Sequence, residues 1–357
     1  MRFLSIAFAS ATLLVAACSS GDTKAGDSAT SSGGIDLTGA GATFPNPIYR
    51  KWIADYAAET GVKINYQSIG SGGGIRQFQQ GTVDFGASDG PMSDEEMSQA
   101  RHGASLHFPT ILGAVVMTYN LPGVTTPLRL TGEVIGAIYM KEITKWNDAR
   151  IVALNPSVKL PATDIIVVHR SDGSGTTYVF TDYLASASPK WDVAAGGPGR
   201  GKEVNWPVGL GGQGNEGVSG QVKQTPGSIG YVELAYATQN QLPAAHVRNK
   251  AGEFIEPSIA SITAAAEGVV ASLTPDSDYR ISIVNGPGAG GYPISSFTWF
   301  LVYKTPPDAA KGKKLVDFLR WIYAKGQQSA PSLDYAPLPP ALVQRLTDRL
   351  GTIVLTP

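Results

Sequence analysis

Three segments of the sequence combine Ser or Thr with closely spaced glycines and then continue into a pattern typical of a helix. They run from Thr38 to Pro45, from Ile69 to Gly74 and from Asp172 to Thr177. The start of a helix presents backbone N–H groups without helical partners and carries roughly half a unit of positive charge. Glycine lets this backbone approach a ligand closely, and hydroxyl groups add further donors. One such turn is typical of an ordinary helix cap, but three together favour a binding site for an oxyanion.

Arg170 lies just before the third turn and follows Ile165–Val168, a β-branched run that predicts a buried strand. Open α/β sheets bind ligands at the carboxyl ends of their strands, so Arg170 is well placed to meet an anion. Its planar guanidinium group suits two oxygens of a tetrahedral anion. Asp172 would hold this guanidinium in place, or else the two residues form a surface ion pair worth about 0–1 kcal/mol.

Asp89 is the residue that does not suit a simple anion site. It follows the apolar run Val83–Ala87, and a carboxylate beside an anion repels it unless the anion carries a proton to donate. Hydrogen phosphate carries such a proton at neutral pH and sulfate does not. A buried, unpaired acceptor facing a bare anion is costly. From the residues alone two interpretations stay open: Asp89 selects a protonated anion, or it caps the turn after the apolar run.

Two glycine patterns resemble nucleotide-binding motifs, and we reject both. Residues Gly209–Gly214 fit G-x-G-x-x-G, but Pro207 precedes them and is a poor member of a central strand. Residues Gly196–Lys202 resemble a phosphate-binding loop of ATPases, but Glu203 stands where a Ser or Thr would hold magnesium. We expect the whole stretch 196–220 to be loop and turn.

The body of the chain shows no pattern typical of a metal centre or a catalytic nucleophile. The four His residues have no ligand spacing, and the one Cys is Cys18, near the N-terminus. Ser174 stands between glycines, but Asp172 replaces the first Gly of the G-x-S-x-G motif. Charged residues make up 16% of the chain, its net charge is −1, and Lys and Arg do not cluster, which argues against nucleic acid. We expect no catalytic residue, metal, cofactor or nucleic-acid partner.

The elements that must position these residues alternate between strand and helix. The spacing of apolar residues predicts a helix over Pro47–Thr60, and the alternation over Val62–Tyr66 predicts a strand. A capping box at Ser93–Glu96 opens another helix, and Ile111–Met117 predicts a short buried strand. A late helix is predicted by an apolar stripe at Leu315, Phe318, Leu319 and Ile322. This order indicates α/β architecture with mostly parallel sheets, and about 320 residues favour two domains.

The N-terminus is typical of an export signal. Arg2 precedes the mostly apolar stretch Phe3–Ala17, whose length at about 1.5 Å per residue is too short for a hydrocarbon core of about 30 Å. Residues 1–17 therefore predict a signal peptide. Its end resembles a bacterial lipobox, so we expect Cys18 to carry a lipid; the alternative is a conventional signal with an incidental Cys. Residues 18–34 then form the lipidated cysteine and a flexible tether.

Six stretches of the chain, in order, resemble the substrate-binding protein of bacterial high-affinity phosphate ABC transporters, and the resemblance covers about residues 36–345. These stretches are Thr38–Pro45, Asp84–Asp89, Arg170–Thr176, Trp206–Gly212, Pro226–Glu233 and Leu333–Pro339. The resemblance implies a type II periplasmic-binding-protein fold with two lobes, each a mostly parallel sheet flanked by helices, and a ligand in the cleft between them. It places lobe 1 at 35–112 plus 294–357 and lobe 2 at 113–293.

The resemblance also implies a role for each site residue. Asp89 would accept the phosphate proton, and Asp172 would orient Arg170. The donors to the phosphate oxygens would be Thr43, Phe44, Ser71, Arg170, Ser174, Gly175 and Thr176. The implied protein is an exported monomer of the periplasm or cell envelope that catalyses no reaction and delivers inorganic phosphate to the permease subunits of an ABC transporter. Its membrane anchor rests on Cys18 alone, because a lipobox is not general in the family.

Three other functions stay open at this point. The site could take another tetrahedral oxyanion such as sulfate or molybdate, although Asp89 argues against an anion without a proton. It could belong to a phosphate-ester hydrolase, although no nucleophile with a His base is evident. The protein could also be a sensor or adhesin that uses phosphate only as a signal.

Overall fold

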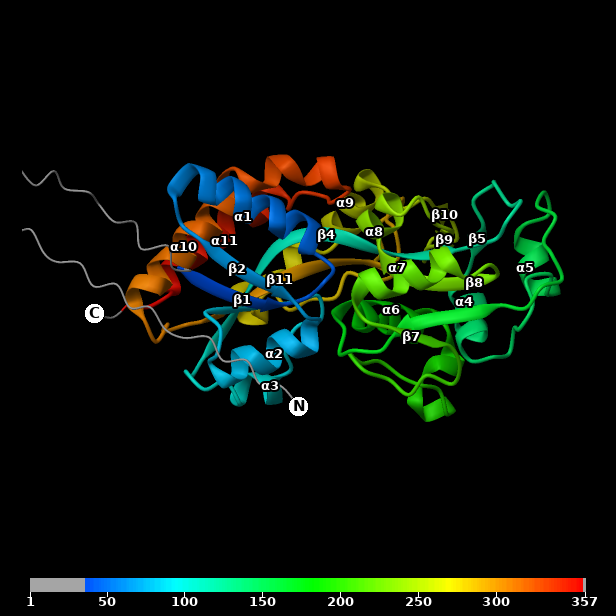
Figure 1. Cartoon of the computed structure of the whole chain (residues 1–357), viewed down its shortest axis with the longest axis horizontal. Coiled ribbons are helices and arrows are strands. Elements are labelled where there is room, and N and C mark those ends of the chain that lie inside the picture. Colours follow the sequence, from blue (N-terminus) through cyan, green and yellow to red (C-terminus); the bar gives the residue numbers. More distant parts are fainter. Residues whose placement is uncertain (1–35, 356–357) are drawn as a thin grey trace, which may run out of the picture. The chain divides into compact units, whose positions relative to one another are not determined.

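The computed structural model describes residues 36–355, which belong to one compact unit. The predicted signal peptide, Cys18 and the tether lie outside the described residues. Helices and strands alternate along the chain, as the sequence predicts for an α/β protein (Figure 1).

The main sheet has eight strands within the described residues, and two parallel blocks form its ends. Its order is β2 (Ile64–Ser68), β1 (Leu37–Gly41), β3 (Phe85–Ser88), β11 (Ser295–Tyr303), β4 (Ser105–Tyr119), β8 (Ser228–Glu233), β6 (Ile166–Arg170) and β7 (Leu210–Gly212). Strands β2, β1 and β3 pair in parallel, and so do β8, β6 and β7. The long strands β11 and β4 pair antiparallel with each other and with the blocks on either side. A small second sheet contains β10 (Phe254–Ile255), β9 (His246–Arg248) and β5 (Arg129–Leu130).

Helices cover the sheet, and several begin directly where a strand of a parallel block ends (Figure 1). The α-helices are α1 (Asn46–Thr60), α2 (Ser71–Gln80), α3 (Asp94–Ser98), α4 (Gly132–Tyr139), α5 (Ala149–Leu154), α6 (Gly175–Ala187), α7 (Gly214–Gln224), α8 (Leu234–Gln239), α9 (Ile259–Glu267), α10 (Ala309–Ala324) and α11 (Pro340–Arg349). The loops after β1, β2, β6 and β7 lead into α1, α2, α6 and α7, so these four helix starts stand at carboxyl ends of parallel strands.

Local sequence signals account for several boundaries. Helix α1 ends at Gly61, whose left-handed φ of 76° suits glycine. The predicted capping box opens α3, because Ser93 accepts from the backbone of Glu96 and the Glu96 carboxylate accepts from the Ser93 N–H. The predicted apolar stripe of α10 is buried. These expectations are confirmed.

Two expectations are wrong. The run Ile111–Met117 is not a short strand but the middle of β4, which is 15 residues long because it pairs first with β11 and then with β8. The stretch 196–220 is not loop and turn throughout, because it contains β7 and the start of α7. Pro207 precedes β7 rather than lying in it, and β7 is an edge strand that pairs only with β6.

Close backbone contact fixes the position of α2 against β1. A Cβ atom on Gly74, in α2, would lie 2.4 Å from the Cα of Gly41 and 2.6 Å from the carbonyl oxygen of Ala40. Real Cβ atoms do not approach backbone so closely, so any larger side chain would push α2 away from the strand. Gly220, in α7, offers a matched contrast, because a Cβ atom there would meet nothing within 4 Å.

We predict opposite effects for alanine at these two helical glycines. Gly74→Ala should lower the free energy of unfolding by about 1–3 kcal/mol through overpacking. Gly220→Ala should raise it by about 0.5–1 kcal/mol, because alanine restricts the unfolded chain and fits the helix. Urea unfolding at equilibrium would measure both, and a Gly74→Ala protein as stable as Gly220→Ala would contradict this packing.

Candidate functional site

The predicted glycine turns before α2 and α6 meet beside Asp89. The N–H of Gly72 donates to the carbonyl oxygen of Gly173, at 2.9 Å. A Cβ atom on Gly175 would lie 2.5 Å from the Ser71 Oγ and 2.6 Å from the Asp89 Oδ2. The first turn of α6 can therefore come this close to Ser71 and Asp89 only with glycine at position 175.

Arg170 is buried and held by a planar, two-bonded contact with Asp172. The Arg170 Nε donates to Oδ1 of Asp172 at 2.8 Å, and Nη2 donates to Oδ2 at 2.5 Å. The two side chains are 1% and 16% exposed, so the alternative of a surface ion pair is wrong. The backbone N–H groups of Arg170 and Gly214 donate to the Tyr231 hydroxyl and to Asp172 Oδ1, respectively. The guanidinium is thus fixed at the end of β6, as predicted, and Nη1 reaches the Thr176 Oγ1 at 3.3 Å.

Asp89 lies at the end of β3 and is 1% exposed. Burial raises the pKa of Asp89 to about 7, and hydrogen bonding by Thr298, the positive charge of Arg170 and hydrogen bonding by Ser71 oppose the rise. The Thr298 hydroxyl donates to Oδ1 at 2.9 Å, and the Asp89 N–H donates to the Ser71 Oγ at 3.3 Å. This carboxyl group can therefore gain or lose a proton near neutral pH, which an exposed Asp cannot do.

Thr43 and Phe44 form the turn before α1, and both are buried. Their carbonyl oxygens accept from the Tyr236 and Tyr335 hydroxyls at 2.7 and 2.6 Å. Within residues 36–355, no hydrogen bond engages the N–H of Thr43 or Phe44. These two donors are therefore held in a buried turn and stay free for an anion.

All the predicted donor residues are buried, and hydrogen bonds or close approaches link most of them into one cluster. Ser174 caps α6, where its Oγ accepts from the Thr177 N–H at 3.0 Å. The buried residues are Thr43, Phe44, Ser71, Asp89, Arg170, Ser174, Gly175 and Thr176. The cluster combines hydroxyl and N–H donors, one guanidinium and one carboxyl group with a raised pKa, a set that suits an oxyanion bearing a proton.

Asn215, in the first turn of α7, belongs to this cluster and was missed by the sequence analysis. Its Nδ2 donates to the Thr43 Oγ1 at 2.8 Å and to the Thr176 Oγ1 at 3.2 Å. The signal that could have found it is the Gly209–Gly214 pattern, which we rejected as a dinucleotide motif. That pattern is a fourth strand–glycine–helix turn, and it brings α7 to the same place as the other three.

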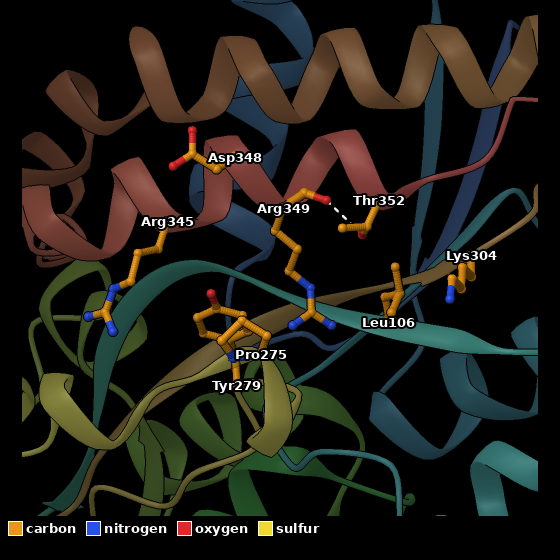
Figure 2. Close-up of a pocket in the computed structure, with 8 residues that line it drawn as sticks. All are labelled: Leu106, Pro275, Tyr279, Lys304, Arg345, Asp348, Arg349 and Thr352. Atoms are coloured by element: carbon orange, nitrogen blue, oxygen red, sulfur yellow. Dashed lines mark hydrogen bonds between the residues drawn. The ribbon is translucent and has the colours of Figure 1, made fainter.

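One cavity of the structure borders this cluster, and a larger one lies elsewhere. One of about 250 Å³ has Asp89 in its wall, together with Tyr178, Arg200, Arg280 and Ser296 among others. The larger, of about 470 Å³, lies beside α11 and contains none of the predicted donors in its lining. Figure 2 shows its lining residues, which are Leu106, Pro275, Tyr279, Lys304, Arg345, Asp348, Arg349 and Thr352.

The two arginines of the larger cavity already have protein partners. Arg345 donates to the carbonyl oxygens of Leu273 and Val270 at 2.8 and 2.9 Å. Arg349 pairs with Asp278 and stacks on the Tyr279 ring. These contacts tie α11 to the preceding loops, which gives both cations a structural role.

The described residues offer neither a metal site nor a membrane-spanning helix. Within residues 36–355, no three His, Cys, Asp or Glu side chains gather in a group that could hold a metal ion. In the same part of the chain, no helix is long and apolar enough to span a membrane.

Comparison with known families gives the class of protein that this fold and this cluster define. A model described as "PBP superfamily domain" matches residues 22–325. The chain therefore belongs to the PBP superfamily, and the α/β fold of the described residues agrees with that assignment.

Curated relatives define the family more closely. Phosphate-binding protein PstS of Xylella fastidiosa (strain Temecula1) is 46% identical over 313 residues, covering 87% of this chain and 84% of the relative. Phosphate-binding protein PstS of Methanocaldococcus jannaschii is 40% identical over 313 residues, covering 82% and 80%. The chain belongs to the PstS family of phosphate-binding proteins, which confirms the resemblance of its sequence.

A solved structure supports the fold. The phosphate binding protein from Stenotrophomonas maltophilia superimposes with a TM-score of 0.68 at 21% identity, covering 88% of this chain and 93% of that one. At this identity the likeness concerns the fold, and it confirms the predicted periplasmic-binding-protein architecture.

We predict that Thr298→Val raises the pKa of Asp89 above 7 in the ligand-free protein. The Thr298 hydroxyl donates to the carboxylate and so lowers its pKa, and valine keeps the shape without the donor. Titration of the carboxyl carbon by NMR would measure the shift. Ser296→Ala is the control, because the Ser296 hydroxyl donates to the backbone carbonyl oxygens of Asp89 and Phe297 and not to the Asp89 carboxylate. A Thr298→Val protein with an unchanged or lowered pKa would contradict this geometry.

Proposed function

We propose that this protein is the exported binding component of a high-affinity phosphate importer. It captures inorganic phosphate and passes it to the permease subunits of an ABC transporter. The observation that carries the proposal is the buried cluster of donors around Arg170 that faces one carboxyl group with a pKa of about 7. The names of relatives with 40–46% identity support the same ligand.

The phosphate oxygens take donors from three helix starts and from one cation. The first turns of α2 and α6 and the turn before α1 supply N–H groups, whose positive dipole ends stabilise an anion. Arg170 supplies a fixed positive charge, and Asp172 keeps its guanidinium in one orientation. The proposed contacts are those of Thr43, Phe44, Ser71, Arg170, Ser174, Gly175 and Thr176.

Asp89 gives the site its selectivity. In its ionised form it accepts a hydrogen bond from the proton of hydrogen phosphate. Sulfate has no proton at neutral pH, so the same carboxylate meets a bare anion oxygen in a buried place, where an unpaired acceptor costs free energy. This argument also disfavours molybdate, the other open oxyanion. No contact in the described residues specifically favours a hydrolase, and the relatives are named as binding proteins.

Release of phosphate requires the protein to open, because the proposed ligand groups are buried. We place the two lobes at 35–112 plus 294–357 and at 113–293. The first boundary falls within β4 and the second just before β11, the two strands that join the parallel blocks. Bending at these strands would break two contacts between the proposed lobes. One is the hydrogen bond from Asn215 Nδ2 to Thr43 Oγ1, and the other is the ion pair between Lys202 Nζ and Glu96 Oε2, which are 2.9 Å apart.

The proposed setting is the cell envelope. Residues 1–17 direct export, Cys18 carries a lipid, and residues 18–34 tether the binding unit to the membrane while leaving it free to reach the permease. The protein acts as a monomer that uses no cofactor.

The selectivity proposal predicts a preference for phosphate over sulfate that weakens as the pH falls. Above pH 7, Asp89 is mainly ionised and repels sulfate. As the pH falls toward 7, a growing fraction of Asp89 carries a proton that it can donate to sulfate. Sulfate affinity should therefore rise by up to about tenfold for each pH unit from 8.5 down to about 7, and level off below that. Titration calorimetry of phosphate-stripped protein at pH 5.5 to 8.5, with phosphate and then with sulfate, would measure both affinities.

Asp89→Asn is the control for this experiment. Asparagine has a similar shape and can donate at every pH, so sulfate binding should become stronger at pH 8 and independent of pH. A sulfate affinity that stays equally low from pH 5.5 to 8.5 in the wild type would exclude this role of Asp89. An absence of phosphate binding in the wild type would overturn the proposed function itself.

The anchor is tested separately from the ligand. Cys18→Ser should abolish incorporation of labelled palmitate and release the protein from the membrane fraction of expressing bacteria. Phosphate affinity should stay the same, because the ligand groups lie in residues 43–176. Equal labelling of the wild type and the variant would show that Cys18 is an incidental residue.

A further inference from the structure

Asn215 is buried, and its contacts leave no doubt about the orientation of its side-chain amide. Its Oδ1 accepts from the backbone N–H of Glu233 at 2.8 Å. A backbone N–H can only donate, so the oxygen of the amide must face Glu233 and the NH₂ group must face the other way. The other side holds the hydroxyl groups of Thr43 and Thr176, and Nδ2 donates to both.

The acceptor capacity of the Thr43 hydroxyl is filled by Asn215 alone. Its Oγ1 accepts from the backbone N–H of Asn215 at 3.2 Å and from Nδ2 at 2.8 Å. A hydroxyl oxygen accepts two hydrogen bonds and donates one. The Thr43 proton must therefore point elsewhere, and within residues 36–355 no acceptor engages it.

The Thr176 hydroxyl also accepts two hydrogen bonds from the protein. Its Oγ1 accepts from Arg170 Nη1 at 3.3 Å and from Asn215 Nδ2 at 3.2 Å. A guanidinium group has no acceptor, so this contact also has a fixed direction. The proton of Thr176 is likewise left without an acceptor in the described part of the chain.

We propose that Asn215 is a positioning residue that turns the hydroxyl protons of Thr43 and Thr176 toward the bound anion. This inference rests on the proposed function, and it adds a residue that itself need not touch phosphate. Fixing both hydroxyls as donors removes two acceptors that would otherwise rotate toward the ligand. Asp89 then stays the acceptor for the proton of hydrogen phosphate. Asn215 thus supports the same selectivity by keeping the two hydroxyls from accepting that proton.

Asn215 also links α7 to β8 through Glu233, and a purely structural role is the competing explanation. The two roles differ in what they affect. A structural role changes stability and lowers phosphate affinity by the same factor whichever donor is missing. A positioning role depends on the hydroxyl that is positioned.

A double-mutant cycle separates the two explanations. Asn215→Asp keeps the oxygen that accepts from Glu233 but replaces the donor NH₂ with an acceptor, so Thr43 and Thr176 would turn their protons toward residue 215. We expect phosphate affinity to fall at least about 100-fold, since hydrogen bonds to charged groups are strong. In a Thr43→Val background, which has no hydroxyl to position, the same change should cost at least about tenfold less.

The cycle also removes the effect of the new charge, which acts equally in both backgrounds. Ser71→Ala is the matched control, because Ser71 is a proposed donor that forms no hydrogen bond with Asn215 in the described part of the chain. In that background, Asn215→Asp should keep its full effect. Titration calorimetry of the four proteins in each cycle, with urea unfolding as a check on folding, gives the result. Equal losses in the wild-type and Thr43→Val backgrounds would overturn the positioning role. Wild-type protein that does not bind phosphate would instead overturn the proposed function.

Discussion

The buried charge of Arg170 is the interaction on which the rest of the site depends. A guanidinium group that is 1% exposed needs compensation, and Asp172 supplies it through two parallel hydrogen bonds. Burial raises the pKa of Asp89, and the charge of Arg170 is one of the interactions that oppose this rise. The balance leaves the pKa of Asp89 at about 7. A buried cation, a fixed partner and a carboxyl group with a pKa of about 7 are the features on which the proposed recognition of a protonated anion rests.

Glycine makes this arrangement possible, because the charged groups and the helix starts must lie almost in contact. A Cβ atom on Gly70 would lie 2.3 Å from Asp172 Oδ2, and one on Gly175 would overlap Ser71 and Asp89. Gly70 also has a left-handed φ of 85°, which other residues rarely adopt. The glycine spacing that first indicated an oxyanion site therefore reflects close approach between segments as much as the ligand itself.

The sequence predicts those parts of the site that depend on neighbouring residues. Helix starts, caps and the order of Arg170 and Asp172 follow from short-range chemistry, and the structure brings them together as expected. The glycine pattern at 209–214 marks a turn before α7, but short-range chemistry does not show that β7 pairs with β6 and so carries Asn215 toward the Thr43 turn. The length of β4 was missed for the same reason, since it depends on two partners that are distant in sequence. Pairing between remote strands, rather than local propensity, decides both.

A chain with a net charge of −1 needs no basic surface to hold an anion. Its other cations are largely engaged, as Arg345 and Arg349 are beside α11. In the proposed site, attraction comes instead from the single buried cation Arg170 and from helix dipoles, oriented N–H groups and hydroxyls. All of these act at short range and away from water, where a given dipole acts more strongly. Oriented donors and acceptors can distinguish a protonated anion from an unprotonated one, because each group faces a particular oxygen of the ligand. A general positive surface charge cannot make that distinction. In this proposal, the burial that requires the protein to open is also the source of its selectivity.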